Sequence, residues 1–438
     1  MSTLTLSLGS LGLILVLIAL RLPIGVAMGL VAFAGFWYVR DLNVALSILR
    51  DTPFVFAASW DLSAIPMFLL MGAVAGNSGI GTALFRAAVA WFGSLPGGLA
   101  VATNWACAGF GAASGSSVAA AAVMARLAVP EMLKHKYDKG LATGVCASGG
   151  TLDALIPPSI AFVIYGIFAE VSIVKLLLAG IIPGILTATI YMIMIVGRAW
   201  LNPKVAPPIV FDDRQALWRE RWASLGEIWP IVVLIMGVIG GLYAGIVTPT
   251  EGGAAGALLA VVIGVAQRKL TWEGFVDSFK DAISTTSQLF FIGIGAIIYT
   301  KFLALAGTAD MFVDLIGKWA LDPLLLVIGV SIIYVILGTF MDPLGMILLT
   351  IPVFVPMFAA LKLDLVWFGV LVVKYIGISL LTPPVGFNIY VVATATGNTV
   401  PLKTIYRGCY WFLGAEVIIM ALLIAFPEIS LWLPNSMQ

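Results

Sequence analysis

Residues 150–159 read GTLDALIPPS, and residues 380–388 read LLTPPVGFN. Each stretch places two consecutive prolines inside an apolar segment. A proline removes one backbone donor and its ring collides with the preceding turn, so a helix cannot continue unbroken through the pair. Inside a bilayer the freed carbonyl groups are tolerated only where they face protein, water or an ion. The two stretches therefore predict two discontinuous helices with unpaired backbone oxygens at the breaks.

The composition is that of a protein embedded in a membrane. Hydrophobic residues make up 61% of the 438 residues and charged residues 10%, whereas soluble domains carry about 25% charged residues. Apolar runs of roughly 20 residues, enough to cross a hydrocarbon core about 30 Å thick, recur at 228–245, 283–300 and 410–426. The first run, 4–20, lacks a basic leader and a cleavage site, so we expect a retained span. The expected fold class is an all-α polytopic membrane protein.

No motif of an enzyme occurs in the chain. The sequence contains no Gly-rich phosphate loop of the Walker type, no HExxH and no GxSxG. Its three cysteines, Cys107, Cys146 and Cys409, lack metal-binding spacing and are expected to serve as small packing residues. The single histidine, His135, lies in a basic loop, and the net charge is only +1. We therefore expect no enzyme, no cofactor and no nucleic-acid partner.

The two Pro-Pro pairs belong to a longer series of matched positions. Pro157 precedes Pro383 by 226 residues (383 − 157 = 226), and the other matches share this offset or one of 227. A near-constant offset over most of each half indicates a duplication. The further matches are Gly25 with Gly252, Ala27 with Ala254, Gly29 with Gly256, Gly111 with Gly338, Gly115 with Asp342, Lys136 with Lys362 and Asp138 with Asp364.

Each half is expected to contain a hairpin followed by a broken helix. The hairpin arms are about 16–18 residues long and bend at a small polar tip, so they form either two spans or one re-entrant hairpin; we expect re-entrant hairpins. The predicted units are a first repeat, 1–200, with its hairpin at about 97–134 and its broken helix at about 139–170; a cytoplasmic connecting loop, 201–227; and a second repeat, 228–438, with its hairpin at about 322–361 and its broken helix at about 366–397.

Charged residues in the loops orient the two halves. The loop 134–139 after the first hairpin carries three lysines, whereas its counterpart, 362–364, carries one lysine and one aspartate. Because positive loops stay in the cytoplasm, the basic connecting loop and the segment 403–407 are also assigned there. The assignments agree if the two hairpins enter from opposite faces, which defines inverted repeats. Arg40 and Arg50 fit less well, since they fall on the predicted outer side. Broken helices at corresponding places in such repeats indicate a transporter binding site.

The first hairpin tip, 114–117 (Ser-Gly-Ser-Ser), has the chemistry of a site for a small cation. Its hydroxyls and closely approaching backbone offer several oxygens to a hard ion such as Na⁺ without a full buried charge. The ends of the half-helices add dipoles of both signs, so one break can hold a cation on one side and a carboxylate on the other. Taken alone, small residues also fit close helix packing; opposite a Pro-Pro break, we favour the ion site.

Further polar residues lie at the second tip and at the two breaks. Asp342 is a functional candidate because a carboxylate at membrane depth is costly; the alternative is a cap on the following helix. Thr382 and Asn388 flank the second break and offer side-chain oxygens. Asp153 lies inside the first break, where it can bind a cation, relay a proton or contact a polar substrate. Arg126, in the second arm of the first hairpin, can face an anionic substrate.

Six motifs spread over nearly the whole chain carry a resemblance to one family. They are 65–72 (IPMFLLMG), 114–119 (SGSSVA), 155–159 (LIPPS), 248–251 (TPTE), 338–343 (GTFMDP) and 381–386 (LTPPVG). In combination they resemble the large membrane subunit of the tripartite ATP-independent periplasmic (TRAP) transporters.

The resemblance implies a secondary transporter of the bacterial inner membrane, driven by a Na⁺ gradient, that imports organic acids such as C4-dicarboxylates or sialic acid. It implies a fold similar to the ion-transporter superfamily, in which a domain with two hairpins moves like an elevator. It also implies two protein partners: a small four-helix membrane subunit, here a separate chain, and a periplasmic substrate-binding protein. Membrane lipid surrounds the multi-pass chain.

The family pattern implies two cation regions with the substrate between them. The first region comprises Ser114, Gly115, Ser116, Ser117, Gly150 and Pro157. The second comprises Gly338, Thr339, Asp342, Thr382, Pro383 and Gly386. The residues expected to contact substrate are Ser116, Arg126, Asp153, Pro158, Ser159 and Asn388.

Asp153 departs from the family pattern, in which a small residue is frequent at this place, and its counterpart at the offset of 226 is Ser379. The substrate and the coupling stoichiometry therefore stay open. Two other functions also stay open: a self-sufficient ion-coupled organic-anion symporter of the same superfamily, and a membrane protein without transport activity. The duplicated broken helices argue against the latter, since such a protein needs no second, inverted copy.

The possible roles of Asp153 are separable by mutation. If its carboxylate contacts the substrate, Asp153→Ser changes the affinity or selectivity for the substrate more than the Na⁺ dependence of uptake. An unchanged substrate profile with an altered Na⁺ dependence, measured by uptake into vesicles, assigns Asp153 to a cation site instead.

Overall fold

The computed structural model describes residues 3–208, 214–308, 311, 322–339 and 341–436. Over these residues the chain forms helices joined by turns, without a strand. Within this described part, five helices are long and apolar enough to cross a membrane, or up to seven if each of two bent pairs counts as one span. The structure confirms the expected all-helical, multi-pass architecture.

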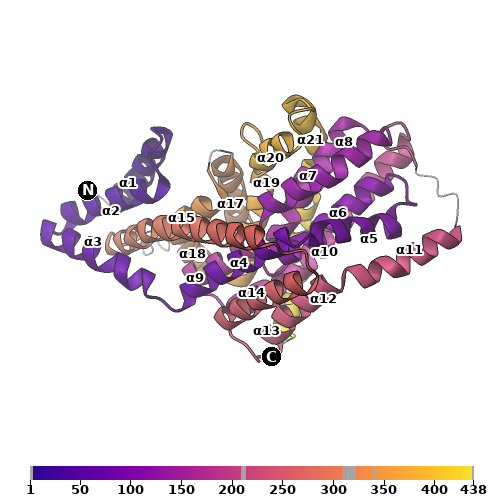
Figure 1. Ribbon diagram of the computed structural model, residues 1–438. Helices are drawn as coiled ribbons and strands as arrows, with labels where there is room; N and C mark the ends of the chain where they lie inside the picture. Colours follow the sequence, from indigo (N-terminus) through magenta and orange to yellow (C-terminus); the bar gives the residue numbers. More distant parts are fainter. Residues whose placement is uncertain (1–2, 209–213, 309–310, 312–321, 340, 437–438) are drawn as a thin grey trace.

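The helices of the first half lead from the N-terminus to a long helix that ends near residue 200 (Figure 1). In order they are α1 (Thr3–Ala19), α2 (Ile24–Val39), α3 (Leu42–Ala57), the short 3₁₀ helix η1 (Asp61–Ser63), α4 (Ala64–Asn77), α5 (Ile80–Phe92), α6 (Gly98–Ser114), α7 (Ser117–Lys134), α8 (Lys139–Gly149), the 3₁₀ helix η2 (Gly150–Ala154), α9 (Ile160–Phe168) and α10 (Ile173–Leu201).

The helices of the second half end at the C-terminus. In order they are α11 (Arg214–Glu227), α12 (Trp229–Ile235), the π-helical turn η3 (Met236–Gly240), α13 (Gly241–Tyr243), α14 (Pro249–Ala266), α15 (Trp272–Leu305), α17 (Pro323–Gly338), α18 (Pro343–Ala360), α19 (Leu365–Ser379), α20 (Phe387–Ala395), α21 (Leu402–Ala425) and α22 (Glu428–Asn435).

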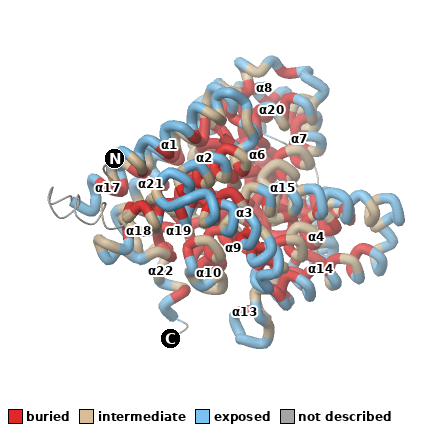
Figure 2. Tube along the Cα trace, turned by 90° about the vertical axis from the view of Figure 1, so that its left-hand side faces the viewer, coloured by how far each residue is buried: buried red, intermediate tan, exposed pale blue. Residues whose placement is uncertain are grey.

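Two groups of helices organise the molecule. The frame group consists of α1–α4, α14 and α15: α15 packs against α2 and α4, and α4 packs against α14. Figure 1 shows α15 running from the end formed by α1–α3 to the middle of the molecule. The core group consists of α6–α10 and α17–α22, in which α8 packs against α21 and α20 packs against α7. Nearly all of α6, α8 and α19 is buried, and Figure 2 shows the buried segments gathered in the interior of the molecule.

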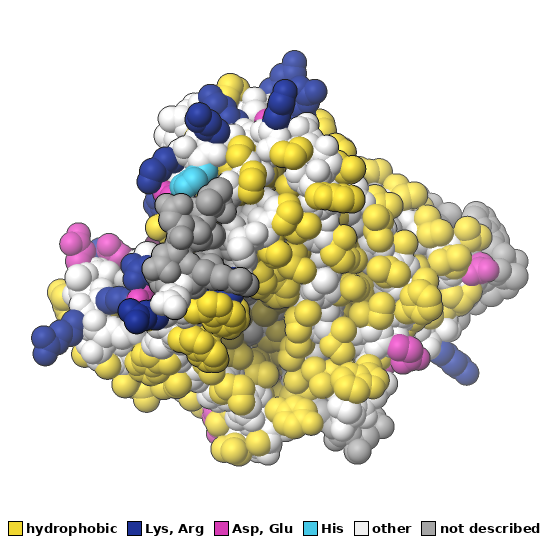
Figure 3. All heavy atoms as spheres, turned by 90° about the vertical axis from the view of Figure 1, so that its right-hand side faces the viewer, with side chains coloured by type: hydrophobic (Ala, Val, Ile, Leu, Met, Phe, Trp, Pro, Cys, Tyr) yellow, Lys and Arg dark blue, Asp and Glu magenta, His cyan; other side chains and the backbone are white. Residues whose placement is uncertain are grey.

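The outer surface is apolar over wide areas. Hydrophobic side chains cover much of the face seen in Figure 3, and Lys and Arg side chains gather at its upper and left margins. Exposed large apolar residues occur on α10, α17 and α21, among them Ile193, Ile332 and Val417. A surface of this kind fits contact with lipid, because soluble monomers rarely expose large continuous apolar areas.

Both Pro-Pro pairs interrupt a helix. α8 gives way to η2 at Gly150, and α9 begins only after Ser159, whose hydroxyl accepts the N–H of Phe162 at 3.4 Å and donates to the carbonyl of Ala154 at 2.5 Å. In the second half, α19 ends at Ser379 and α20 begins after Gly386, which has a left-handed backbone. Both Pro-Pro bonds are cis.

The described parts of the connecting segment expected over 201–227 include a helix. α10 continues to Leu201, and α11 covers the second part of the segment. α11 forms because it finds partners on α5: Arg86 pairs with Glu227 at 3.0 Å, and Arg221 donates to the carbonyl of Ala90 at 2.9 Å. The predicted connecting loop thus contains a helix over residues 214–227, which was not predicted from the sequence because its partners lie far away along the chain and leave no local signal.

A buried ion pair joins three helices of the core group. The ammonium of Lys374 on α19 lies 2.6 Å from the carboxylate of Glu416 on α21, and both side chains are almost fully buried. Two residues of α10 complete the cluster: Thr187 accepts a hydrogen bond from Lys374 at 3.2 Å, and the hydroxyl of Tyr191 donates to Glu416. Buried charges are tolerated when paired in this way. The pair fixes the first half of the second broken helix against its neighbours.

Removing one member of this pair leaves the other charge buried without a partner. Glu416→Gln should therefore lower the stability of the purified protein by about 3–5 kcal/mol, whereas the double variant Lys374→Met/Glu416→Leu should recover most of the loss. Thermal unfolding in detergent, followed by intrinsic fluorescence, measures both. A single variant that melts with the wild type would show that the pair contributes nothing to holding α19.

Candidate functional site

The first hairpin tip contacts the first break. α6 ends at Ser114, Gly115 takes a left-handed backbone (φ +60°), and the hydroxyl of Ser116 accepts the N–H of Ala119 at the start of α7. A β-carbon at Gly115 would lie 3.2 Å from the carbonyl oxygen of Pro158. Both the backbone conformation and the close approach favour glycine here. The tip therefore lies directly on the Pro-Pro segment of the first broken helix.

Asp153 lies deep in this contact. Its side chain is fully buried, and neither carboxylate oxygen has a hydrogen-bond partner. A β-carbon at Gly111 on α6 would lie 2.9 Å from one of these oxygens. The glycine at this position of the hairpin arm thus makes room for the carboxylate.

Asn388 belongs to the second broken helix but lies against the first. Its side-chain NH₂ donates to the carbonyl of Ala147 on α8 at 3.0 Å, while its side-chain oxygen is buried without a partner. A β-carbon at Gly150 would lie 3.1 Å from that NH₂ group and 2.7 Å from the carbonyl oxygen of Ser117. The structure thus brings Gly150, Ser117 and Asn388 together.

The second tip has a different polar arrangement. Asp342 is exposed, and its carboxylate caps α18 by accepting the N–H of Gly345 at 2.9 Å. Thr339 donates to the carbonyl of Ile336 at 2.7 Å, and Thr382 donates to that of Ile378 at 2.8 Å. Phe340, within this tip, lies outside the described residues. The capping role weighed for Asp342 is present, and both threonine oxygens keep free lone pairs.

A polar cavity of about 430 Å³ opens beside the first tip, between α4, α6, α7 and α15. Its lining includes Ser114, Ser116 and Arg126, which the sequence singled out, and Asn77 and Asp281, which it did not. Asp153, Pro158, Ser159 and Asn388 are not among the lining residues. Two features of the sequence could have pointed to these missed residues: Asp281 is a carboxylate just before an apolar run, and Asn77 lies at the C-terminal end of a helix.

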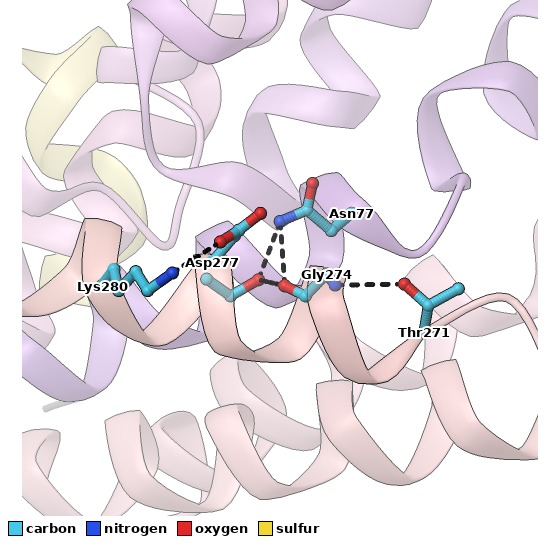
Figure 4. Close-up of polar contacts among 6 residues, drawn as sticks. Asn77, Thr271, Gly274, Asp277 and Lys280 are labelled. Carbon is cyan, nitrogen blue, oxygen red and sulfur yellow. Dashed lines mark hydrogen bonds and ion pairs between the residues drawn. The ribbon is translucent and has the colours of Figure 1, made fainter.

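Asn77 joins two helices of the frame group, α4 and α15, beside this cavity. Its side-chain NH₂ donates to the hydroxyl of Ser278 at 2.8 Å and to the carbonyl of Gly274 at 3.3 Å, both on α15 (Figure 4). Asp277 and Lys280 form an ion pair on the same helix. α4 and α15 therefore form one rigid wall of the cavity, and the first hairpin forms the other.

Two broken helices, hairpin tips packed on them and a polar cavity bearing an arginine define a membrane transport protein. The family model described as "Tripartite ATP-independent periplasmic transporter, DctM component" matches residues 11–429. The chain belongs to this family.

Individual relatives agree with this assignment. A C4-dicarboxylate TRAP transporter large permease protein of Pseudomonas aeruginosa is 32% identical over 405 residues, which cover 90% of this chain and 93% of that protein. A sialic acid TRAP transporter large permease protein of Vibrio cholerae is 32% identical over 378 residues, covering 86% and 87%. The crystal structure of the Alcanivorax borkumensis YdaH transporter, at 14% identity, has a TM-score of 0.60 over 90% of both chains, and this likeness shows the fold alone.

These comparisons confirm the resemblance carried by the six motifs. The relatives are permease subunits, so the chain is a transport protein and not an enzyme. The two relatives are named for different substrates. Family membership therefore leaves the substrate of this chain open.

The contact between the frame group and the first tip is testable at one glycine. A β-carbon at Gly72 on α4 would overlap the carbonyl of Ser114, whereas one at Gly76, which lines the same cavity, would meet only Phe110 at 3.8 Å. Overpacking costs about 1–3 kcal/mol. Gly72→Ala should therefore slow uptake by roughly tenfold, and Gly76→Ala should leave it within about twofold. Equal rates for the two variants in reconstituted vesicles would refute the close packing.

Proposed function

We propose that this chain is the large permease subunit of a TRAP transporter that imports an organic acid with a Na⁺ gradient. The observation that carries the proposal is the contact between the serine-rich tip and the first Pro-Pro break, next to a polar cavity. Buried carbonyl and hydroxyl oxygens provide what a small hard cation requires, and a neighbouring guanidinium provides what a carboxylate requires.

Na⁺ is proposed to bind at both breaks. At the first break the oxygen donors come from Ser114, Gly115, Ser116, Ser117, Gly150 and Pro157. At the second they come from Gly338, Thr339, Asp342, Thr382, Pro383 and Gly386. The unpartnered side-chain oxygen of Asn388, buried beside Gly150, supports the first site, because a buried acceptor without a donor is costly unless a ligand completes it.

Contacts within the core group support a pair of inverted repeats. Gly111 packs on Asp153, and their counterparts Gly338 and Ser379 pack on each other in the same way. Thr151 lies against Gly377, its own counterpart at the offset of 226, since a β-carbon at Gly377 would lie 3.2 Å from that of Thr151. A residue touches its counterpart where it lies close to a two-fold axis.

An elevator-type movement follows from the division into two groups. The core group carries both breaks and both tips, whereas the frame group provides the opposite wall of the cavity through α4 and α15. Sliding of the core group along this wall would move the first tip past Gly72 and expose the site to the other side of the membrane. The proposed movement is rigid-body because the Lys374–Glu416 pair locks the core helices together.

The proposed substrate is an organic acid whose carboxylate is held by Arg126. This guanidinium is exposed in the cavity with Ser116, and the relatives are named for C4-dicarboxylate and sialic acid, both carboxylates. Ser116 also belongs to the first cation site and would therefore contact both the ion and the substrate. Pro158 and Ser159 lie behind the tip and would contact substrate only after the tip moves.

The proposed assembly lies in the bacterial inner membrane. Family membership implies a small membrane subunit and a periplasmic binding protein that delivers the substrate. The exposed apolar faces of the helices contact lipid and the small subunit.

Vesicles containing this chain and its small subunit should accumulate the organic acid only when the binding protein and an inward Na⁺ gradient are both present. Replacing Na⁺ by K⁺, or omitting the binding protein, should reduce uptake to the level of empty vesicles. Uptake by this chain alone would instead support a self-sufficient anion symporter. Accumulation without a Na⁺ gradient would contradict the proposed coupling.

A further inference from the structure

Asp153 is a fully buried carboxylate without a partner, placed in the middle of a membrane protein. Both of its oxygens lack hydrogen bonds, and among the described residues no Lys, Arg or His forms an ion pair with it. An isolated charge in an apolar interior is so costly that such a group is normally paired, bound to a cation or neutralised by a proton. The site already described leaves this charge without a function.

The elements around Asp153 provide no counter-charge. η2, which carries Asp153, packs against α6, α7, α8, α9, α10 and α19. The ionisable side chains that these helices bury are Cys107, Cys146, Tyr165, Tyr191, Lys374 and Tyr375, of which only Lys374 can carry a positive charge. Lys374 is already bound to Glu416 at 2.6 Å. No basic group of these helices is free to balance Asp153, so its carboxyl group either carries a proton or is balanced by a cation from outside the chain.

The surroundings of the carboxylate contain further oxygen ligands. The side chain of Ser114 and the backbone N–H of Gly115 interact with it electrostatically without reaching hydrogen-bond geometry. Gly115 in turn lies next to the carbonyl oxygen of Pro158, as a β-carbon there would lie 3.2 Å from it. A hydroxyl, a carbonyl freed by the break and a carboxylate therefore meet at the tip, and hard monovalent cations favour oxygen ligands of these kinds.

Contact with the substrate explains Asp153 less well. Its side chain is not among those lining the cavity, whereas Arg126 and Ser116 are. An organic acid is an anion, and a second anion facing it without a cation between them is repelled. The corresponding residue of the second half, Ser379, has a satisfied hydroxyl that donates to the carbonyl of Ile376 at 2.7 Å.

We propose that the Asp153 carboxylate is a direct ligand of the Na⁺ ion bound at the first hairpin tip, an inference that rests on the proposed Na⁺ coupling. The first ion site is then electrically neutral when occupied.

The test compares Asp153→Asn with the wild type in the purified complex of this chain with its small subunit. Asn keeps the size of the side chain and one oxygen but removes the charge. The Na⁺ concentration that gives half of the maximal thermal stabilisation, measured without substrate, should rise about tenfold in Asp153→Asn, since charged ligands bind much more strongly than neutral ones. The half-saturating substrate concentration for uptake at saturating Na⁺ should stay within about twofold.

Two further variants make the result interpretable. Asp322→Asn also neutralises a carboxylate, at the exposed start of α17, where Asn caps a helix as well as Asp does; its Na⁺ dependence should equal that of the wild type. Asp153→Ser introduces the residue found in the second half and should weaken Na⁺ binding at least as much as Asp153→Asn, which provides a second reading if Asp153→Asn folds poorly.

The outcomes separate this inference from the proposed function. A wild type stabilised by Na⁺ together with an Asp153→Asn variant stabilised at the same concentrations would overturn the role of Asp153 and leave Na⁺ coupling intact. Uptake that changes with pH in the wild type but not in Asp153→Asn, at unchanged Na⁺ affinity, would assign a proton to Asp153 and also overturn it. A wild type that responds to Na⁺ no more than to K⁺ would refute the coupling itself.

Discussion

The structure depends on backbone carbonyl groups that a helix cannot pair. Two consecutive prolines interrupt a buried helix in each half, and a membrane interior provides no water to bind the freed groups. A hairpin tip made of small residues covers the first break, and it can approach closely because Gly111 and Gly115 carry no side chain. The packing of the core group follows from this requirement, since both breaks must be covered by protein.

The buried charged side chains near these breaks fall into two sets, a closed ion pair and an unpaired carboxylate. Lys374 and Glu416 neutralise each other away from the cavity and hold α19, α21 and α10 together. Asp153 is left unpaired at the first tip, whereas Arg126 and Asp281 line the cavity. The unpaired carboxylate behind the tip suits a cation, and the guanidinium in the cavity suits an anionic group. The Lys374–Glu416 pair thus holds helices together, whereas the unpaired carboxylate of Asp153 is left for a ligand.

Much of this arrangement could be predicted from the sequence, because its signals are local. Pro157 and Pro383 mark the breaks by covalent geometry alone, and the Ser-Gly-Ser-Ser run marks a tip by its small size. Contacts between distant segments could not be predicted. Asn388 donates to the carbonyl of Ala147, 241 positions away in the sequence, and Arg221 donates to the carbonyl of Ala90, 131 positions away. No pattern within either segment indicates its partner. The cavity residue Asp281 has a local signal, a carboxylate before an apolar run, but only the fold shows that α15 lies beside the first hairpin.

The central claim is that the two breaks, with their hairpin tips, are cation sites. Electron cryo-microscopy of the complex of this chain with its small subunit, prepared once in Na⁺ and once in K⁺ with the same organic acid, tests it most directly. We predict density for an ion between the first tip and the first break, near Ser114 and Asp153, and at the second break, in Na⁺ only. Breaks that are identical and without ion density in both preparations would contradict the account.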